Sequence, residues 1–352
     1  MKIAVIGTGA IGGVLGAYLV RAGHDLTFCD IDQAHVQAIN TTGLRIEGPG
    51  ETFTVQGRAY NPEALLARGE PLGTVLLCVK AQHTEQAMRT LLPLLGADAQ
   101  VVSCQNGLCE NIIIPIIGKE RTIACFVNFS ADYLEPGRIL YGGPSTFVLG
   151  ELDGSISPRI LALQEVLTAW GPVQVSPNIR GYLWGKLSYA ALLFATAMVD
   201  DTMAAVVGSL RYREALLELC SEVLAVADLE GVTALGFDDW EPAMVYPRGS
   251  RDMAALTVQL ARLEHRMATN KKTRSGIWRD LAVRKRQTEI DHQISPVIAI
   301  GQGHGLALPL TSFLVRVIKD LEAGRRAMSW DNLEELNRVH EASRFQGGGN
   351  GW

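Results

Sequence analysis

The chain has 352 residues, of which 47% are hydrophobic and 20% are charged, and its formal net charge is −5. This composition supplies enough apolar residues for two packed cores and excludes a disordered or fibrous protein. The acidic balance argues against a general nucleic-acid-binding protein, because such proteins need a basic surface.

The six cysteines form no C-x-x-C pair, so we expect free thiols in a reducing compartment. Met1 leads directly into the apolar run Lys2–Ile6, without a charged leader. No apolar stretch reaches the roughly 18 residues that a membrane span needs. The sequence therefore predicts a cytoplasmic protein without a membrane partner. The histidines show neither H-x-x-x-H nor H-E-x-x-H spacing, so we expect no metal site.

Strand and helix patterns alternate in the first half of the chain. The expected strands are Lys2–Ile6, Asp25–Cys29, Val75–Val79, Val101–Ser103 and Thr122–Val127, with helices at Ala10–Arg21 and Thr84–Leu95 between them. Such alternation predicts a parallel sheet with helices on both faces. Gly43–Gly57 indicates a hairpin insertion, and Arg138–Tyr141 and Thr146–Leu149 indicate antiparallel strands that extend the sheet.

Helical patterns dominate from Asn178 onward. The expected helices are Arg180–Val199, Ser209–Glu230, Met253–Met267, Thr288–His304 and Ser312–Ala323, with loops at Pro247–Ser250 and Asn270–Gly276. This change predicts an α/β domain over residues 1–177 and a helical substrate and dimerisation domain over 178–345. The glycine-rich segment 346–352 is expected to be a flexible tail.

A G-x-G-x-x-G motif follows the first strand and opens the first helix. Gly7 permits a tight turn, Gly9 lets the backbone approach a pyrophosphate, and Gly12 lets the helix pack close to the strand. The positive end of the helix dipole and its unpaired N–H groups then face the phosphates. We therefore expect a Rossmann dinucleotide site made by Gly7, Thr8, Gly9, Ala10, Ile11 and Gly12.

Asp30 ends the second expected strand. A carboxylate at this position can accept hydrogen bonds from the adenosine ribose and repels a 2′-phosphate. The next residues, Ile31 and Asp32, supply no arginine to hold such a phosphate. This favours NAD over NADP as the cofactor. Alternatively, Asp30 is simply the N-cap of the following helix.

Six segments of the chain resemble the ketopantoate reductase (2-dehydropantoate 2-reductase) family and follow its order. They are the glycine motif, Cys78–Ala81 (CVKA), Gln105–Gly107 (QNG), Ile179–Leu187 (IRGYLWGKL), Thr288–Asp291 (TEID) and His304–Pro309 (HGLALP). The resemblance implies a nicotinamide-dependent oxidoreductase with an N-terminal Rossmann domain. It also implies a C-terminal all-α domain like that of 6-phosphogluconate dehydrogenase, and a homodimer, for which the range 209–230 has apolar positions to spare.

The resemblance further implies roles for four residues. Lys186 matches the family's catalytic lysine, the general acid for carbonyl reduction, and Glu289 matches the acidic residue that binds substrate and orients this lysine. Asn106 matches the asparagine near the nicotinamide and the substrate carbonyl, and Lys80 matches a lysine on the cofactor side. A cation near the carbonyl suits this chemistry, because hydride transfer builds negative charge on the oxygen.

Simpler explanations exist for three of these residues. Lys186 precedes an apolar helical turn, where an arbitrary lysine usually extends its charged end to solvent. Glu289 follows a run of basic residues and can be a surface charge. Asn106 can be an ordinary turn residue before Gly107.

The chain departs from the family pattern after the catalytic lysine. Ala190 and Phe194 stand where the family has two asparagines that line the substrate pocket. An apolar lining cannot select a hydroxylated substrate by fixed hydrogen bonds. We therefore expect a substrate other than ketopantoate, or one that is held differently.

The basic stretch 270–286 is a second departure. The family usually has a serine ahead of its TEID motif that contacts the substrate carboxylate, and Ser275 is the nearest candidate. Arg274 or Arg279 can instead clamp a carboxylate with two hydrogen bonds. For most of these charges we expect a solvated helix and loop face instead.

These features predict an NAD(H)-dependent enzyme that interconverts a 2-oxo acid, or a related ketone, and its secondary alcohol. The alternatives are a true ketopantoate reductase with a repacked pocket, an opine-type dehydrogenase that needs an amine, and a dinucleotide sensor without turnover. Because the cellular NAD pool is mostly oxidised, an NAD preference hints at oxidation as the physiological direction.

Overall fold

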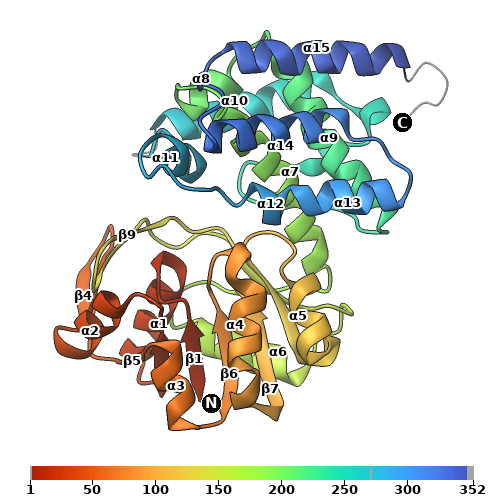
Figure 1. Ribbon diagram of the computed structural model, residues 1–352. Helices are drawn as coiled ribbons and strands as arrows, with labels where there is room; N and C mark the ends of the chain where they lie inside the picture. Colours follow the sequence, from red (N-terminus) through yellow and green to blue (C-terminus); the bar gives the residue numbers. More distant parts are fainter. Residues whose placement is uncertain (1, 270–271, 347–352) are drawn as a thin grey trace. The chain divides into compact units, whose positions relative to one another are not determined.

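The computed structural model describes residues 2–269 and 272–346, and the chain divides into two compact units, residues 1–179 and 180–352 (Figure 1). The division follows Ile179, the first residue of helix α7 (Ile179–Thr196), two residues after the predicted boundary. Of the predicted tail, Gln346 is the last residue of α15 (Asp331–Gln346), and residues 347–352 lie outside the described part.

The first unit is built on an eight-stranded sheet with the strand order β12-β11-β8-β7-β6-β1-β2-β5. The strands are β1 (Ile3–Ile6), β2 (Leu26–Cys29), β5 (Arg58–Tyr60), β6 (Leu72–Leu77), β7 (Leu95–Ser103), β8 (Thr122–Val127), β11 (Phe147–Glu151) and β12 (Gln174–Val175). Neighbouring strands run parallel except for β8 and β11. The predicted α/β class with a doubly wound sheet is therefore confirmed.

Helices cover both faces of this sheet. One face packs against α1 (Ala10–Arg21), α2 (Gln33–Thr41) and α6 (Pro158–Leu167), and the other against α3 (Pro62–Arg68), α4 (Thr84–Leu91) and α5 (Glu110–Ile117). Strand β1 serves both cores, because Ile3 and Val5 lie in one apolar cluster while Ala4 and Ile6 lie in the other. This alternation follows from the two-residue period of a strand.

A second sheet of four strands has the order β4-β3-β10-β9. Its strands are β3 (Leu44–Glu47), β4 (Thr52–Val55), β9 (Ala131–Glu135) and β10 (Arg138–Tyr141). The hairpin expected at Gly43–Gly57 is present as β3 and β4. The expectation that Arg138–Tyr141 extends the main sheet is wrong, because β10 pairs with β3 and β9. Only β11 of the two expected strands extends the main sheet, antiparallel to β8.

The second unit is helical. Its helices are α7, α8 (Met203–Val207), α9 (Arg213–Leu229), α10 (Met253–Thr269), α11 (Gly276–Ala282), α12 (Ile290–Gln293), α13 (Ser295–Gly303), α14 (Pro309–Glu322) and α15. The helix expected at Thr288–His304 is divided, with Pro296 in the first turn of α13. Helices α8, α11 and α15 were not among the predicted helices. Nowhere in the described ranges is a helix long and apolar enough to cross a membrane.

The apolar residues of the range 209–230 lie inside this unit. Most apolar side chains of α9 are buried, among them Leu216, Leu219 and Val223. The spare apolar surface that was expected to form a dimer contact is therefore used to build the helical core. Dimerisation itself stays a prediction.

A partly buried carboxylate fixes the start of α14. The oxygens of Glu222, on α9, accept the backbone N–H groups of Leu310 at 3.0 Å and Thr311 at 2.7 Å, and the Thr311 hydroxyl at 2.7 Å. These N–H groups have no partner within the helix, so the carboxylate of Glu222 satisfies them. Burial raises the pKa of Glu222 to about 7.

Replacing Glu222 should therefore destabilise the helical unit. Glu222→Ala leaves three buried donors without an acceptor, and we expect the free energy of unfolding in urea to fall by about 2–3 kcal/mol. Glu214→Ala, which removes an exposed carboxylate from the same helix, is the control. Equal stability of the two variants would contradict this role.

The raised pKa also predicts a pH dependence. Between the ordinary pKa of 4.5 and the folded value of about 7, the folded chain keeps a proton that the unfolded chain loses. The contribution of Glu222 to stability is thus complete below this window and declines as pH rises through it. Glu222→Gln removes this titration. When urea unfolding is measured across this pH window, the free energy of unfolding of the wild type should therefore fall relative to that of the variant as the pH rises.

Candidate dinucleotide and catalytic site

The glycine turn after β1 leaves little room at two of its three glycines. Gly7 has φ +87°, and a Cβ there would lie 2.7 Å from the backbone nitrogen of Val79. A Cβ at Gly12 would lie 2.1 Å from the carbonyl oxygen of Gly7. Gly9, the N-cap of α1, has φ −66°, and its Cβ would meet nothing within 4 Å. The fold thus requires Gly7 and Gly12, whereas Gly9 borders open space.

Asp30 lies directly against this turn. One carboxylate oxygen accepts the backbone N–H of Thr8 at 2.7 Å, and the other accepts that of Asp32 at 3.0 Å. Asp32, not Asp30, is the N-cap of α2, since its carboxylate accepts the N–H groups of Ala34 and His35. The alternative that Asp30 merely caps the helix is therefore wrong.

Thr8 contributes to the turn through its backbone. Its side chain is fully buried and donates a hydrogen bond to the carbonyl oxygen of Cys29 at 3.2 Å. Ala10 and Ile11, in the first turn of α1, are partly exposed. A ligand at the helix N-terminus would accordingly meet backbone N–H groups.

Lys80 and Asn106 follow the next two strands of the sheet. Lys80 is partly buried after β6, and Asn106 is exposed after β7, before Gly107 with φ +91°. Gln105 joins the two loops, because its amide donates to the Val79 carbonyl at 2.9 Å and to the Thr84 hydroxyl at 2.8 Å. Gln105 belongs to the QNG motif, but its role as a link between these loops was not predicted.

Glu110 is a second buried acid near this edge. It begins α5, only 4% of its surface is exposed, and burial raises its pKa to about 7.

The candidate cofactor residues share one edge of the sheet. The glycine turn, Asp30, Lys80 and Asn106 all follow the carboxyl ends of parallel strands, from β1, β2, β6 and β7. In open α/β sheets ligands bind outside these ends, at the point where the strand order reverses. The structure thus brings the expected cofactor residues of the first unit together.

In the second unit, the segment around Lys186 is closely packed. Trp184 is buried, and a Cβ at Gly185 would lie 2.1 Å from the carbonyl oxygen of Leu235. The Ser188 hydroxyl donates to the Gly185 carbonyl at 2.7 Å and accepts the Trp240 indole N–H at 2.9 Å. Lys186 itself is partly exposed on α7, a helix that these neighbours hold in place.

Glu289 is flanked by two anchored residues. The backbone N–H and the hydroxyl of Thr288 both donate to Glu322 on α14, at 2.8 and 2.7 Å. Asp291 forms an ion pair with Lys319, also on α14. Glu289 itself is partly exposed at the start of α12. Because Thr288 and Asp291 are both bound to α14, the position of Glu289 depends on that helix. Its partnership with Lys186 stays a prediction.

The expected substrate residues have different surroundings. Ala190 is partly exposed, whereas Phe194 is buried, with 1% of its surface exposed. The Ser275 hydroxyl accepts the backbone N–H of Trp278 at 3.1 Å and so caps α11. Arg274 forms an ion pair with Asp200 and lies 4.2 Å above the Trp278 ring. Structural contacts therefore already engage Ser275 and Arg274, and their substrate role stays a prediction.

Ion pairs within the unit neutralise part of the basic stretch. The buried carboxylate of Asp280 accepts hydrogen bonds from Arg284 at 3.0 Å and Arg286 at 2.9 Å. These two arginines are therefore engaged in structural contacts with the end of α11.

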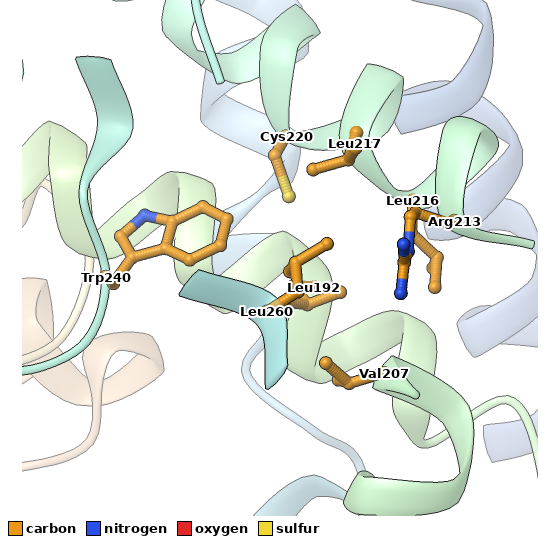
Figure 2. Close-up of a pocket in the computed structure, with 8 residues that line it drawn as sticks. All are labelled: Leu192, Val207, Arg213, Leu216, Leu217, Cys220, Trp240 and Leu260. Atoms are coloured by element: carbon orange, nitrogen blue, oxygen red, sulfur yellow. The ribbon is translucent and has the colours of Figure 1, made fainter. Parts of the chain in front are cut away.

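A small cavity lies inside the helical unit (Figure 2). It is lined by Leu192, Val207, Arg213, Leu216, Leu217, Cys220, Trp240 and Leu260. Its volume of about 10 Å³ holds roughly one water molecule, which is too small for an organic substrate. Across residues 2–269 and 272–346, no group of three or more His, Cys, Asp or Glu side chains is arranged to hold a metal ion.

Two family models match the chain. Residues 3–154 match the ketopantoate reductase PanE/ApbA model, and residues 178–322 match the model of its C-terminal domain. A 2-dehydropantoate 2-reductase of Mesorhizobium japonicum is 31% identical over 261 residues, which cover 66% of this chain and 77% of the relative.

Solved structures have the same architecture. A PanE/ApbA family ketopantoate reductase from Ralstonia eutropha is 27% identical with a TM-score of 0.75, covering 93% of this chain and 100% of that one. D-mandelate dehydrogenase with NADH and anilino(oxo)acetate is 21% identical with a TM-score of 0.77, covering 92% and 99%. The chain therefore belongs to the ketopantoate reductase family of oxidoreductases.

Proposed function

We propose that this chain is an NAD(H)-dependent oxidoreductase that interconverts a 2-oxo acid, or a related ketone, and its secondary alcohol. The observation that carries the cofactor choice is the carboxylate of Asp30, which accepts the Thr8 N–H at 2.7 Å beside the glycine turn. Each oxygen keeps a second lone pair for the ribose hydroxyls of NAD. A 2′-phosphate at this place would meet like charge.

Asp32 adds a second negative charge nearby. Burial raises its pKa, but the hydrogen bond from Tyr133 and those from the backbone of His35 and Ala34 outweigh this, so the pKa lies below its ordinary value. Ile31, between the two acids, is 78% exposed and carries no charge. Ketopantoate reductases typically use NADPH, so an NAD preference would set this chain apart within its family.

The catalytic roles are those that the family resemblance implies, and they suit the chemistry of carbonyl reduction. The nicotinamide, when bound, supplies or accepts the hydride. In reduction, Lys186 donates a proton to the substrate oxygen, and in oxidation neutral Lys186 accepts the hydroxyl proton. Glu289 orients Lys186 and binds substrate, and Asn106 donates a hydrogen bond near the reacting carbonyl.

The substrate class rests on the two residues that replace asparagines. Neither Ala190 nor Phe194 has a side-chain group that could hydrogen-bond the hydroxyl of ketopantoate, and the partly exposed Ala190 favours an apolar substituent. Anilino(oxo)acetate, present in the D-mandelate dehydrogenase structure, is a 2-oxo acid derivative with an aryl substituent. A panel of 2-oxo and 2-hydroxy acids with alkyl and aryl side chains, assayed with both cofactors, tests this class.

A true ketopantoate reductase is the second candidate, which the 31% identical relative favours. It would be selected if ketopantoate were turned over faster than every other acid of the panel. An amine requirement would instead indicate an opine-type dehydrogenase.

The space at Gly9 gives a test of dinucleotide binding that separates ligand contact from folding. Gly9→Ala adds a methyl group at φ −66°, where it meets no protein atom within 4 Å. We expect its free energy of unfolding to stay within about 1 kcal/mol of the wild type. If a pyrophosphate approaches this backbone, NADH affinity falls about tenfold or more, measured by fluorescence titration. Unchanged affinity would place the ligand elsewhere.

The exposed Ile31 gives a test of cofactor choice. Ile31→Arg places a guanidinium beside the expected 2′-phosphate, and we expect NADPH affinity to rise about tenfold. Ile31→Gln, polar but uncharged, is the control and should leave the NADH-to-NADPH ratio nearly unchanged. A wild type that already binds NADPH better than NADH would refute the proposed preference.

Lys186 is tested by separating chemistry from nucleotide binding. Lys186→Ala should lower kcat on the best acid of the panel by about 10²–10⁴-fold while leaving NADH affinity unchanged. Arg180→Ala, which removes an exposed cation from the same helix, should do neither. Nucleotide binding without turnover of any acid by the wild type would instead support a sensor.

A further inference from the structure

The imidazole of His35 is completely buried between two segments of the first unit. Its Nε2 lies 2.8 Å from the carbonyl oxygen of Thr8, in the glycine turn. Its Nδ1 lies 2.9 Å from the backbone nitrogen of Gly137, in the turn between β9 and β10. His35 belongs to α2, so one side chain joins three separate parts of the fold.

These two contacts define the protonation state of the ring. The backbone N–H of Gly137 can only donate, so Nδ1 accepts and carries no proton. The carbonyl of Thr8 can only accept, so Nε2 carries the proton and donates it. The ring is therefore neutral, with its single proton on Nε2.

The bond to Thr8 determines how the next peptide is oriented. In a trans peptide the carbonyl and the following N–H point in opposite directions. With the Thr8 carbonyl directed at His35, the N–H of Gly9 points away from the buried imidazole. Gly9 is the N-cap of α1, where the helix presents its unpaired N–H groups.

We propose that His35 is a positioning residue for the dinucleotide: it fixes the Thr8–Gly9 peptide so that the Gly9 N–H faces the pyrophosphate, and it links this peptide to the β9–β10 turn. This inference rests on the proposed binding of NAD(H). It assigns a role in dinucleotide binding to a buried residue that is not expected to contact the ligand itself.

The surroundings of His35 support a fixed ring. The Tyr133 ring packs edge-on against the imidazole, 5.0 Å between centroids, and its hydroxyl donates to Asp32 at 2.9 Å. Asp30 and Asp32 are the charged groups beside this cluster, and backbone N–H groups engage both. Thr8 is consequently held at its N–H, its hydroxyl and its carbonyl.

Three variants of the full-length chain separate the two hydrogen bonds of His35. In His35→Gln the longer amide can place its nitrogen near the Nε2 position and keep the bond to Thr8. In His35→Asn the shorter amide can accept the Gly137 N–H but does not reach Thr8. His35→Ala makes neither bond. The probe is NADH, titrated by fluorescence, and thermal unfolding monitors the stability of each variant.

We expect the His35→Gln variant to bind NADH within about threefold of the wild type, and the other two variants to lose about tenfold or more. Equal affinity in all four proteins would overturn the proposal, as would equal losses for Gln and Asn at equal stability. Wild-type protein that binds no dinucleotide would refute the proposed function as well.

A second measurement uses the wild type alone and does not depend on the variants' folding. The ¹⁵N chemical shifts of the His35 ring should show a protonated Nε2 and an unprotonated, hydrogen-bonded Nδ1, with or without NADH. A proton on Nδ1 would overturn the proposal while leaving the proposed function untouched.

Discussion

The backbone of Thr8 is held on both sides by hydrogen bonds to side chains, and the geometry of the glycine turn depends on these contacts. Asp30 accepts the Thr8 N–H, and His35 donates to the Thr8 carbonyl. Gly7 before it and Gly12 after it leave no space for a side chain. A loop with this many constraints cannot easily change conformation, so its outward N–H groups are preorganised for an anion.

In the helical unit, side-chain carboxylates likewise hold backbone N–H groups at two places. The carboxylate of Glu222 accepts two backbone N–H groups at the start of α14, and the carboxylate of Glu322 accepts the backbone N–H of Thr288. Because Glu322 belongs to α14, the first of these contacts supports the second. The segment that carries Glu289 is thus positioned through a chain of hydrogen bonds that begins inside α9.

Much of the first unit could be predicted because its signals are local. The glycine spacing, the strands on either side of α1 and the position of Asp30 are all within a short stretch of sequence. His35 escaped notice because its partners are 27 and 102 residues away and become neighbours only after folding. The pairing of β10 with β3 is equally non-local.

In the helical unit, helix α15 was missed because it is mostly polar and buries few apolar residues, such as Leu333 and Leu336. Lys186 and Glu289 became candidates through family resemblance, since neither periodicity nor spacing distinguishes them from surface charges. Local patterns also gave no sign of the contacts that now engage Ser275 and Arg274.

The two buried acids with pKa values of about 7, Glu110 and Glu222, alter the charge that the folded chain carries. The formal value of −5 counts both as fully ionised. Near neutrality each of these two carboxyl groups holds a proton about half of the time. When the chain unfolds at neutral pH the two groups ionise fully, so their share of the heat that a calorimeter records depends on the ionisation enthalpy of the buffer.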